Sequence, residues 1–485
     1  MKKIFLSLIL SSVLLTACEG FLSELPTKSS TDPLETVEQL RAVLDNPNYR
    51  AVCYAAAFSN DDCEVSYDIV DQYTSFGVAG LYHYTFNVED VENEAEDALW
   101  TQHYGTIYRA NLVIENVDKV SGDPAEKARV KAEAHFYRAY LYWELANSYC
   151  MPYAAGNMNE LGLPKRITTS MEEDYARTSL AETYAQIDRD IAEALKIDKT
   201  ARDYAWRSSK AAVQAFLSRY YLHRCEYDKA VEAADFALNN LGQTALKDYN
   251  TLQATVGVNG GSELQDISSS NVKLTNWQEF FFMRFAYLSS QWFTPSQDLI
   301  ALYDQTNDMR YKWFFTNPNP RFGQTLQLPD DCRYNVFSDG AMLLCGPTIQ
   351  EVMLNRAEAL VRRSNPDIAG AMNQINKLRE YRIAPHAGRD LSASTKEDAL
   401  KKILDERRRE LAFAHRWWDI RRFAYNETPD DDVAITREFY VVTMGSIDRT
   451  QVKQYSLPVG SRRYAVPING VNIDSSKGTL VQNEY

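Results

Sequence analysis

A charged segment near the C-terminal end, residues 403–423, constrains the fold of this chain more than any other feature. It holds six arginines, interspersed acids and two adjacent tryptophans. At 3.6 residues per turn, Ile403, Arg407 and Leu411 share one stripe of a helix. A solvated helix face, which is the alternative, does not explain two neighbouring tryptophans. The segment therefore predicts one helix whose arginines form partly buried forks with carboxylates and stack on indole rings, as lysine cannot.

Helical periodicity dominates the rest of the chain, and the helices come in pairs. Apolar residues recur at helical spacing in 132–145 with 183–195, in 211–222 with 227–238, and in 356–361 with 368–378. Small residues alternate with large ones in these segments, as in tetratricopeptide helix pairs, which stack into a right-handed superhelix. The predicted fold class is mostly α: a tetratricopeptide-like helix-pair superhelical scaffold, at about 100–240 and 347–425, with a loop-rich, aromatic insert and short β segments.

Two loop-rich stretches interrupt the helical pattern. From about 257 to 345 the chain carries glycine, serine and Asn-Pro turns crowded with aromatic residues, and residues 63–86 are similar. The tail, 433–485, has short β-like runs. Binding residues tend to lie on loops held by a rigid scaffold, so we expect the insert at about 257–345 to contact a ligand. We expect residues 18–485 to form a single domain.

The N-terminus has the pattern of a bacterial lipoprotein signal. Lys2 and Lys3 precede a short uncharged run that ends in Leu15-Thr-Ala-Cys18, and this run is shorter than the ~20 residues of a membrane span. We expect residues 1–17 to be a signal peptide and Cys18 to be acylated, with chains such as palmitate anchoring the protein to a membrane. An ordinary cleaved signal with an incidental cysteine is the alternative.

Charge limits the classes of ligand. The chain carries a net charge of −14, and loss of Lys2 and Lys3 with the signal makes it −16. We therefore expect no nucleic acid partner, because neutralising phosphates requires a basic face. An acidic surface favours solubility and neutral ligands.

Six cysteines follow Cys18, and an exported protein meets a compartment in which disulfides form. Two pairs are close enough in sequence to bond, namely Cys53 with Cys63 and Cys332 with Cys345, although the connectivity stays open. Cys225 lies among apolar helical residues and is expected to be a buried thiol.

Several motifs resemble those of the SusD/RagB family, the surface nutrient-binding lipoproteins of Bacteroidetes. Residues 403–423 are similar to the C-terminal signature of that family and depart from it at Ala414, where Glu is usual. Further similar elements follow in the family's order: 18–26, 100–115, 132–149, 207–222, 294–310 and 464–469. The resemblance covers most of the mature chain. It implies a core that includes Trp100, Trp143, Trp417 and Trp418.

The resemblance to this family implies a binding protein and not an enzyme. Such a protein captures oligosaccharides at the outer face of an outer membrane, to which its lipid anchor holds it, and delivers them to a SusC-like TonB-dependent transporter. Three alternatives stay open: a peptide-binding RagB-like importer component, a structural solenoid scaffold, and a glycoside hydrolase.

Aromatic residues are expected to form the ligand site, because the C–H faces of sugars pack against aromatic rings. Three tryptophans that no core motif claims and three loop tyrosines are the candidates: Trp277, Trp292, Trp313, Tyr73, Tyr82 and Tyr84. Any one of them could instead belong to the core. The hypothesis is that at least two of the six contact the ligand.

Motifs for catalysis or metal binding are not found in the sequence. Acidic neighbours occur at 61–62, 330–331 and 430–432, on irregular segments where side chains rarely aim at one bond, and we expect them to be solvated. There is no His-Glu-x-x-His, no Gly-x-Ser-x-Gly, no P-loop and no Cys-x-x-Cys. The sequence predicts no catalytic residue, no metal site and no cofactor.

Overall fold

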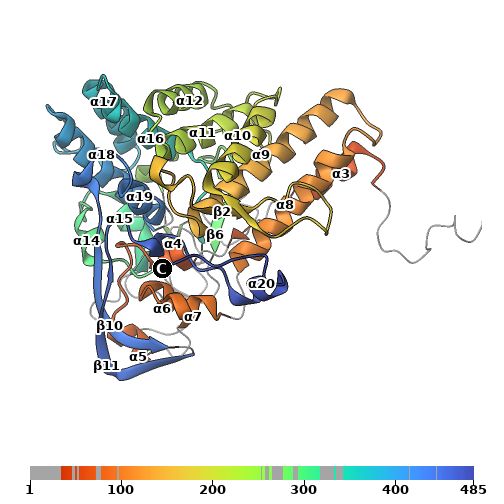
Figure 1. The fold of residues 1–485 in the computed structure, drawn as a ribbon. Helices are drawn as coiled ribbons and strands as arrows, with labels where there is room; N and C mark the ends of the chain where they lie inside the picture. The colour runs from red at the N-terminus through yellow and green to blue at the C-terminus, as the bar shows by residue number, and fades with distance from the viewer. Residues whose placement is uncertain are drawn as a thin grey trace, which may run out of the picture.

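The structure is a computed structural model (Figure 1). It describes residues 34–45, 50–51, 54–72, 78–94, 98–252, 254–256, 262–264, 277–287, 293–316, 333–334, 342–413, 415–443 and 445–485. The predicted signal peptide and Cys18 lie outside these residues. Within the described ranges, no helix combines the length and the apolar character needed to cross a bilayer.

Paired helices form the upper layer of the molecule in Figure 1. They are α3 (Val37–Leu44), α8 (Ala98–Asn116), α9 (Pro124–Tyr149), α10 (Leu180–Ala194), α11 (Lys210–His223), α12 (Tyr227–Asn239), α16 (Ile349–Arg362), α17 (Ile368–Glu380) and α18 (Lys396–Glu410). Successive helices pack on each other, α8 on α9, α9 on α10 and α11 on α12, and α16 contacts α12, α17 and α18. The predicted tetratricopeptide-like scaffold is confirmed.

Helix α9 is the central helix of this layer. Asp123 caps its N-terminus by accepting the amide hydrogen of Glu126, and a proline follows at the first helical position. Its C-terminal part is almost entirely buried. Phe282 packs edge-on against Phe136 and Tyr140 of this helix, with ring centroids 5.0 and 5.7 Å apart. The part of the predicted insert that holds Phe282, residues 277–287, therefore runs through the core.

The segment 403–423 forms two helices and not one. Helix α18 ends before Leu411, and α19 (Arg416–Phe423) begins after a turn. Phe413 in that turn has a φ of 63°, which no α-helix allows, and its N–H donates to the carboxylate of Asp62 at 2.9 Å. The prediction of one continuous helix was wrong, because a buried acid far away in the sequence replaces the helical hydrogen bond.

Buried arginines and carboxylates join α16, α18 and α19. Arg422 makes a two-pronged fork with Glu358, with two hydrogen bonds of 2.7 Å, and Arg362 bonds the same carboxylate at 2.6 Å. Arg407 and Arg422 hold Asp419 at 2.6 and 2.8 Å. We call these five residues the buried ion network. The predicted arginine–carboxylate forks are confirmed.

An arginine also lies against indole rings, but it comes from α11, whereas the sequence predicted such stacking for the arginines of 403–423. Arg219 of α11 pairs with Glu351 at 2.6 Å and lies 5.4 Å from the ring centroids of Trp143 and Trp418. Asp431, in one of the acidic stretches expected to be solvated, is instead bound by Arg362 of the network. The four tryptophans expected in the core are all buried: Trp100, Trp143, Trp417 and Trp418.

Short helices and a hairpin form the lower layer in Figure 1. The helices of this half and of the region between the layers are α4 (Tyr54–Phe58), α5 (Tyr67–Gln72), α6 (Val78–Tyr84), α7 (Val88–Glu92), α14 (Gln297–Ala301), α15 (Met309–Phe314) and α20 (Gly470–Ser475). The hairpin joins β10 (Ile435–Thr443) to β11 (Ser446–Leu457) and is longer than the predicted β-like runs. From Ile435 to Phe439, buried and exposed residues alternate, as in a strand with one covered face.

The remaining strands are short. A three-stranded sheet has the order β1 (Arg50–Ala51), β6 (Phe285–Tyr287) and β9 (Met342–Leu344), with β1 parallel and β9 antiparallel to β6. Three antiparallel pairs complete the set: β2 (Leu161–Pro164) with β3 (Arg177–Ser179), β4 (Ala254–Val256) with β5 (Ser262–Leu264), and β7 (Phe315–Thr316) with β8 (Arg333–Tyr334).

The cysteines differ from expectation at one position. Cys225 is exposed and not buried, because it follows the end of α11 in a left-handed turn with a φ of 58°. Cys63 is a buried free thiol 3.9 Å from the hydroxyl of Thr294, and burial raises its pKa to about 12. Cys53 and Cys332 lie outside the described residues.

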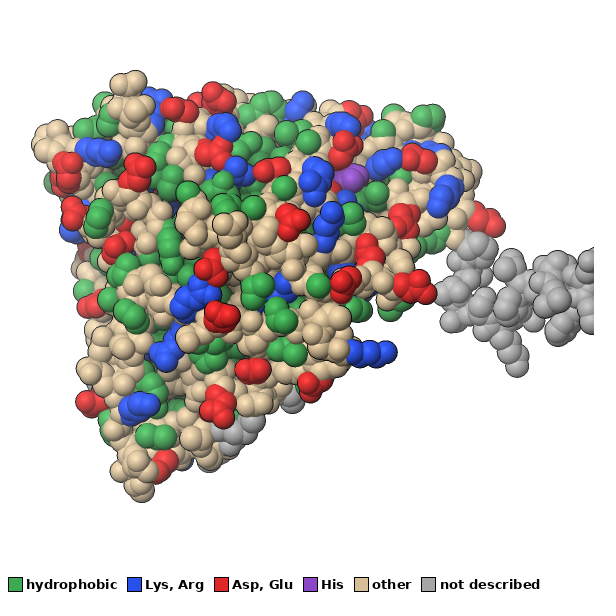
Figure 2. Space-filling model, viewed as in Figure 1, with side chains coloured by type: hydrophobic (Ala, Val, Ile, Leu, Met, Phe, Trp, Pro, Cys, Tyr) green, Lys and Arg blue, Asp and Glu red, His purple; other side chains and the backbone are tan. Residues whose placement is uncertain are grey.

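On the face shown in Figure 2, acidic and basic side chains are interspersed. The described side chains drawn there form no broad basic patch. This view agrees with the negative net charge of the chain.

Candidate functional site

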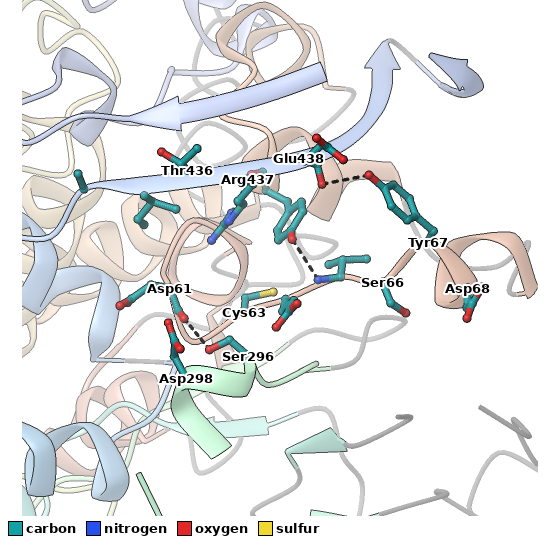
Figure 3. A pocket seen from close by; sticks show the side chains of 15 residues that line it. Asp61, Cys63, Ser66, Tyr67, Asp68, Ser296, Asp298, Thr436, Arg437 and Glu438 are labelled. Atoms are coloured by element: carbon teal, nitrogen blue, oxygen red, sulfur yellow. Dashed lines mark hydrogen bonds between the residues drawn. The ribbon is translucent and has the colours of Figure 1, made fainter. Parts of the chain in front are cut away.

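A cavity of about 610 Å³ opens beside the hairpin (Figure 3). Three segments far apart in the sequence line it: residues 61–68 before and within α5, residues 296–298 at the start of α14, and residues 434–438 of β10 and the residue before it. Tyr84, at the end of α6, completes the wall. We call this space the hairpin cavity.

The 61–68 segment is fixed by arginines of the charged segment 403–423. Arg416 makes two hydrogen bonds to Asp61, at 2.7 and 2.8 Å, and Arg408 donates to Asp62 at 2.5 Å. Burial opposes ionisation of Asp61, but Arg416 and Arg408 outweigh it and hold its pKa below the ordinary value. The prediction that this acid pair is solvated was wrong, since both carboxylates are bound by arginine and Asp62 is fully buried.

Arg437 lies in the wall of the hairpin cavity, but its guanidinium is bound by backbone carbonyls. Its guanidinium donates to the carbonyls of Phe58 and Tyr84, at 2.8 and 2.7 Å, and also to that of Asn60. Because Phe58 and Tyr84 end α4 and α6, the cation binds the negative ends of two helices. It also lies 4.1 Å from the ring centroid of Tyr84, whose pKa is raised by burial to about 12.

The exposed rim of the cavity is polar and acidic. Apart from Ala434, its exposed side chains are all polar or acidic: Glu64, Ser66, Asp68, Asp298, Thr436 and Glu438. None of these four carboxylates pairs with a cation among the described residues, although Glu64 accepts the amide hydrogen of Gln297 at 3.1 Å. The rim therefore offers hydrogen-bond acceptors and hydroxyls, and it disfavours anionic ligands.

Tyr67 supplies an aromatic ring at this rim. The half-buried ring is stacked on Phe439, with centroids 5.7 Å apart, and tilted against Tyr440 at 4.6 Å. Its hydroxyl donates to the carbonyl of Glu438 at 3.4 Å (Figure 3). The ring is thus held in place by the hairpin, and a ligand in the cavity would meet it beside the carboxylates.

Comparisons with known proteins agree with this fold. A family model described as "Starch-binding associating with outer membrane" matches residues 21–222, and the model of the "SusD family" matches residues 349–485. The chain belongs to the SusD/RagB family.

Relatives in the family are distant. The SusD-like protein P38 of Formosa agariphila is 24% identical over 387 residues, which cover 68% of this chain and 73% of that protein. SusD-like protein P2 of the same organism is 29% identical over 175 residues, covering 36% of this chain and only 32% of the relative.

Solved structures share the SusD fold. A SusD-like carbohydrate binding protein from Bacteroides vulgatus superposes with a TM-score of 0.63 at 18% identity, over 92% of this chain and 97% of that one. A SusD superfamily protein from Bacteroides thetaiotaomicron gives 0.62 at 19% identity, over 93% and 100%. At such identities the likeness shows the fold alone.

Four of the six aromatic residues predicted for the ligand site lie in described ranges of this SusD/RagB protein, and the hairpin cavity does not bring these four together. Of those in described ranges, Tyr84 alone lines the hairpin cavity. Tyr82 is buried and accepts the amide hydrogen of Gly445 at 2.7 Å. Tyr73 and Trp292 lie outside the described residues.

The two other tryptophans make structural contacts. Trp277 is buried, and its indole N–H donates to Glu279 at 3.1 Å. Trp313 is half-buried and donates to the carbonyl of Tyr249 at 3.2 Å. Lys312 lies 4.6 Å from the ring centroid of Trp313.

Sequence reasoning missed Tyr67 and the rim residues of β10 as site residues. Tyr67 was one tyrosine among many, and no local pattern marked its contact with Phe439. The strict alternation from Ile435 to Phe439 was the available signal, since it places Thr436 and Glu438 on one exposed face. In the described part of the chain, no group of three or more His, Cys, Asp or Glu side chains could hold a metal ion.

Proposed function

We propose that this SusD/RagB protein is a cell-surface glycan-binding lipoprotein. It captures oligosaccharides and delivers them to a SusC-like TonB-dependent transporter in the outer membrane, with acylated Cys18 as its anchor. The lipobox pattern of the sequence supports the anchor, and the description of the matching family model supports the location. The name of the Bacteroides vulgatus structure supports carbohydrate as the class of ligand.

The hairpin cavity carries this proposal. Its volume of about 610 Å³ lies within the range of small-molecule sites, roughly 300–1,000 Å³. Oligosaccharides present C–H faces and many hydroxyl donors. The Tyr67 ring suits the former, and the carboxylates of Glu64, Asp68 and Glu438 suit the latter.

The same carboxylates also indicate the competing class of ligand. A peptide with lysine or arginine side chains would pair with the acidic rim, so a cationic peptide is the second candidate ligand. The six aromatic residues predicted from the sequence stay proposed contacts, and alanine substitution of each tests them: Tyr73, Tyr82, Tyr84, Trp277, Trp292 and Trp313.

Calorimetric titration of the full chain in detergent tests the function. Neutral oligosaccharides of several linkage types and a cationic peptide mixture are the ligands. We expect saturable binding of one glycan class, weakened about tenfold or more by Tyr67→Ala. Tyr67→Phe should bind nearly as well, because the lost hydroxyl donates only to a backbone carbonyl.

Tyr204→Ala is the matched control, since Tyr204 is an exposed tyrosine outside the cavity lining. Binding of the peptides alone would move the ligand to the peptide class. Release of shortened sugars during the titration would instead indicate a glycoside hydrolase. Co-purification with a TonB-dependent barrel, lost on Cys18→Ala together with membrane association, tests the delivery step.

A further inference from the structure

A second cavity, of about 280 Å³, lies between α8 and residues 164–175, which are the end of β2 and the loop after it. We call it the α8 slot. It shares no lining residue with the hairpin cavity, and α8 and the hairpin lie on opposite sides of the view in Figure 1. Asn472 of α20 also lines it. The slot is therefore a separate site in the fold.

Exposed aromatic and apolar side chains gather at this slot. Tyr108 is 42% exposed, Tyr175 40% and Met171 72%, and all three line it. Trp100 and Tyr104, one helical turn apart on α8, line the slot too, with ring centroids separated by 4.8 Å. Large apolar side chains are normally buried. Three exposed ones around a single cavity therefore indicate a surface that binds a ligand or a partner.

The charges at the slot are already neutralised. Arg166 lies 4.4 Å from the ring centroid of Tyr175, and its nitrogens bond the carbonyls of Glu173 and Ser170 at 2.7 and 3.1 Å. The Glu173 carboxylate lies 3.5 Å from the same guanidinium. Because the Arg166 guanidinium is already paired, it is not available to bind a phosphate or carboxylate ligand. The slot therefore suits a neutral ligand.

Two polar side chains of the slot remain available. The Thr101 hydroxyl and the Asn472 amide line it, and neither side chain has a hydrogen-bond partner within the described ranges. Asn111, in contrast, is fully engaged, because it donates to the carbonyls of Arg166 and Thr168 and accepts from Arg138. A ligand with both a flat apolar face and hydroxyls would satisfy the aromatic rings and the free polar groups together.

We propose that the α8 slot is a second glycan site, which holds one neutral pyranose ring between Tyr108 and Tyr175. Thr101 and Asn472 bond its hydroxyls. The small volume of the slot, below that of usual ligand sites at roughly 300 Å³, limits it to one ring, whereas the hairpin cavity is large enough for several. The choice of a sugar rests on the glycan-binding function proposed above, but the site stands apart from the hairpin cavity.

An apolar side chain of a protein partner is the competing occupant. It would fill the space between the rings but leave the Thr101 hydroxyl and the Asn472 amide without partners, at a cost in free energy once water is displaced. This difference favours the sugar.

Saturation-transfer NMR on the full chain in detergent tests the slot. The probes are the methyl pyranosides of glucose, galactose, mannose and xylose, with N-acetyl-leucinamide as the apolar alternative. We expect at least one pyranoside to bind, with a dissociation constant raised about tenfold in Tyr108→Ala and Tyr175→Ala. Thr101→Val should weaken it severalfold. The matched control, Tyr204→Ala, should bind as the wild type does.

Comparing Tyr67→Ala with Tyr108→Ala separates this site from the hairpin cavity. If Tyr67→Ala abolishes pyranoside binding and Tyr108→Ala does not, the slot proposal is wrong and the hairpin cavity stands. If only Tyr108→Ala weakens binding and Tyr67→Ala affects no glycan, the slot stands and the function assigned to the hairpin cavity fails. Binding of N-acetyl-leucinamide without any sugar, or of no probe at all, overturns the slot as a glycan site.

Discussion

The buried ion network and the hairpin cavity both contain acidic side chains, but these differ in burial and in pairing with cations. In the network, Glu358 is held by Arg422 and Arg362, and all of these side chains are buried. In the cavity, Glu64 and Glu438 are exposed and pair with no cation among the described residues. The dense, motif-like charges are buried in ion pairs within the fold, whereas the sparse ones face the hairpin cavity.

The largest effect that tests this comparison is removal of a network carboxylate. Glu358→Ala leaves Arg422 and Arg362 buried without their shared partner, and breaking such a buried pair costs about 3–5 kcal/mol of unfolding free energy. Urea unfolding measures it. The matched control is Glu64→Ala, which should change stability by less than about 0.5 kcal/mol. Equal losses in both variants would contradict the distinction.

Lowering the pH should destabilise the fold by protonating the same carboxylate, that of Glu358. Burial opposes ionisation of Glu358, but Arg422 and Arg362 lower its pKa from 4.5 to about 2. Its ionised form therefore stabilises the fold fully above the unfolded pKa, and this contribution is lost as the pH falls from about 4.5 towards 2. The shift corresponds to about 3 kcal/mol.

Glu358→Gln isolates this acid effect. We expect the wild type to lose more unfolding free energy than the variant between pH 5 and 3, so that the stability gap between them narrows. Urea unfolding at steps of pH measures both. A gap that stays constant over this range would show that Glu358 does not titrate in the unfolding equilibrium.

Asp62 joins the cavity wall to the end of α18 and the turn before α19, and its effect should be intermediate. It binds Arg408 and the N–H of Phe413, while its neighbour Asp61 lines the cavity. Asp62→Ala should lower the unfolding free energy by about 2–3 kcal/mol and also weaken glycan binding, because the 61–68 segment loses its attachment. Asp298→Ala, at an exposed acid of the same cavity, is the control and should leave stability unchanged.

Much of the fold could be predicted from the sequence, because it depends on local patterns. Periodicity gave the helix pairs, and six arginines beside Trp417 and Trp418 indicated buried forks. The break at Phe413 could not be predicted, since it depends on Asp62, which lies about 350 positions earlier in the chain. Local patterns carry no information on such a partner.

The candidate site was less predictable for the same reason. Its residues come from three separate segments, and the contact of Tyr67 with Phe439 joins positions far apart in the sequence. Counting aromatic residues in loops selected Trp277, which is buried and bonded to Glu279. An aromatic-rich segment can be core as readily as binding surface, because both bury flat apolar rings.

The smallest expected change in stability gives the sharpest test of the difference between the buried, paired carboxylates and the exposed carboxylates of the cavity. Glu438 is exposed on β10 at the cavity rim, and its carboxylate makes no ion pair with a described residue. Glu438→Gln should therefore change the unfolding free energy by less than about 0.5 kcal/mol. It should nevertheless weaken glycan binding about three- to tenfold, because a hydroxyl bonds a carboxylate more strongly than an amide. Calorimetric titration and urea unfolding of the same preparation measure both quantities. A loss of stability without a loss of affinity would place Glu438 with the structural charges.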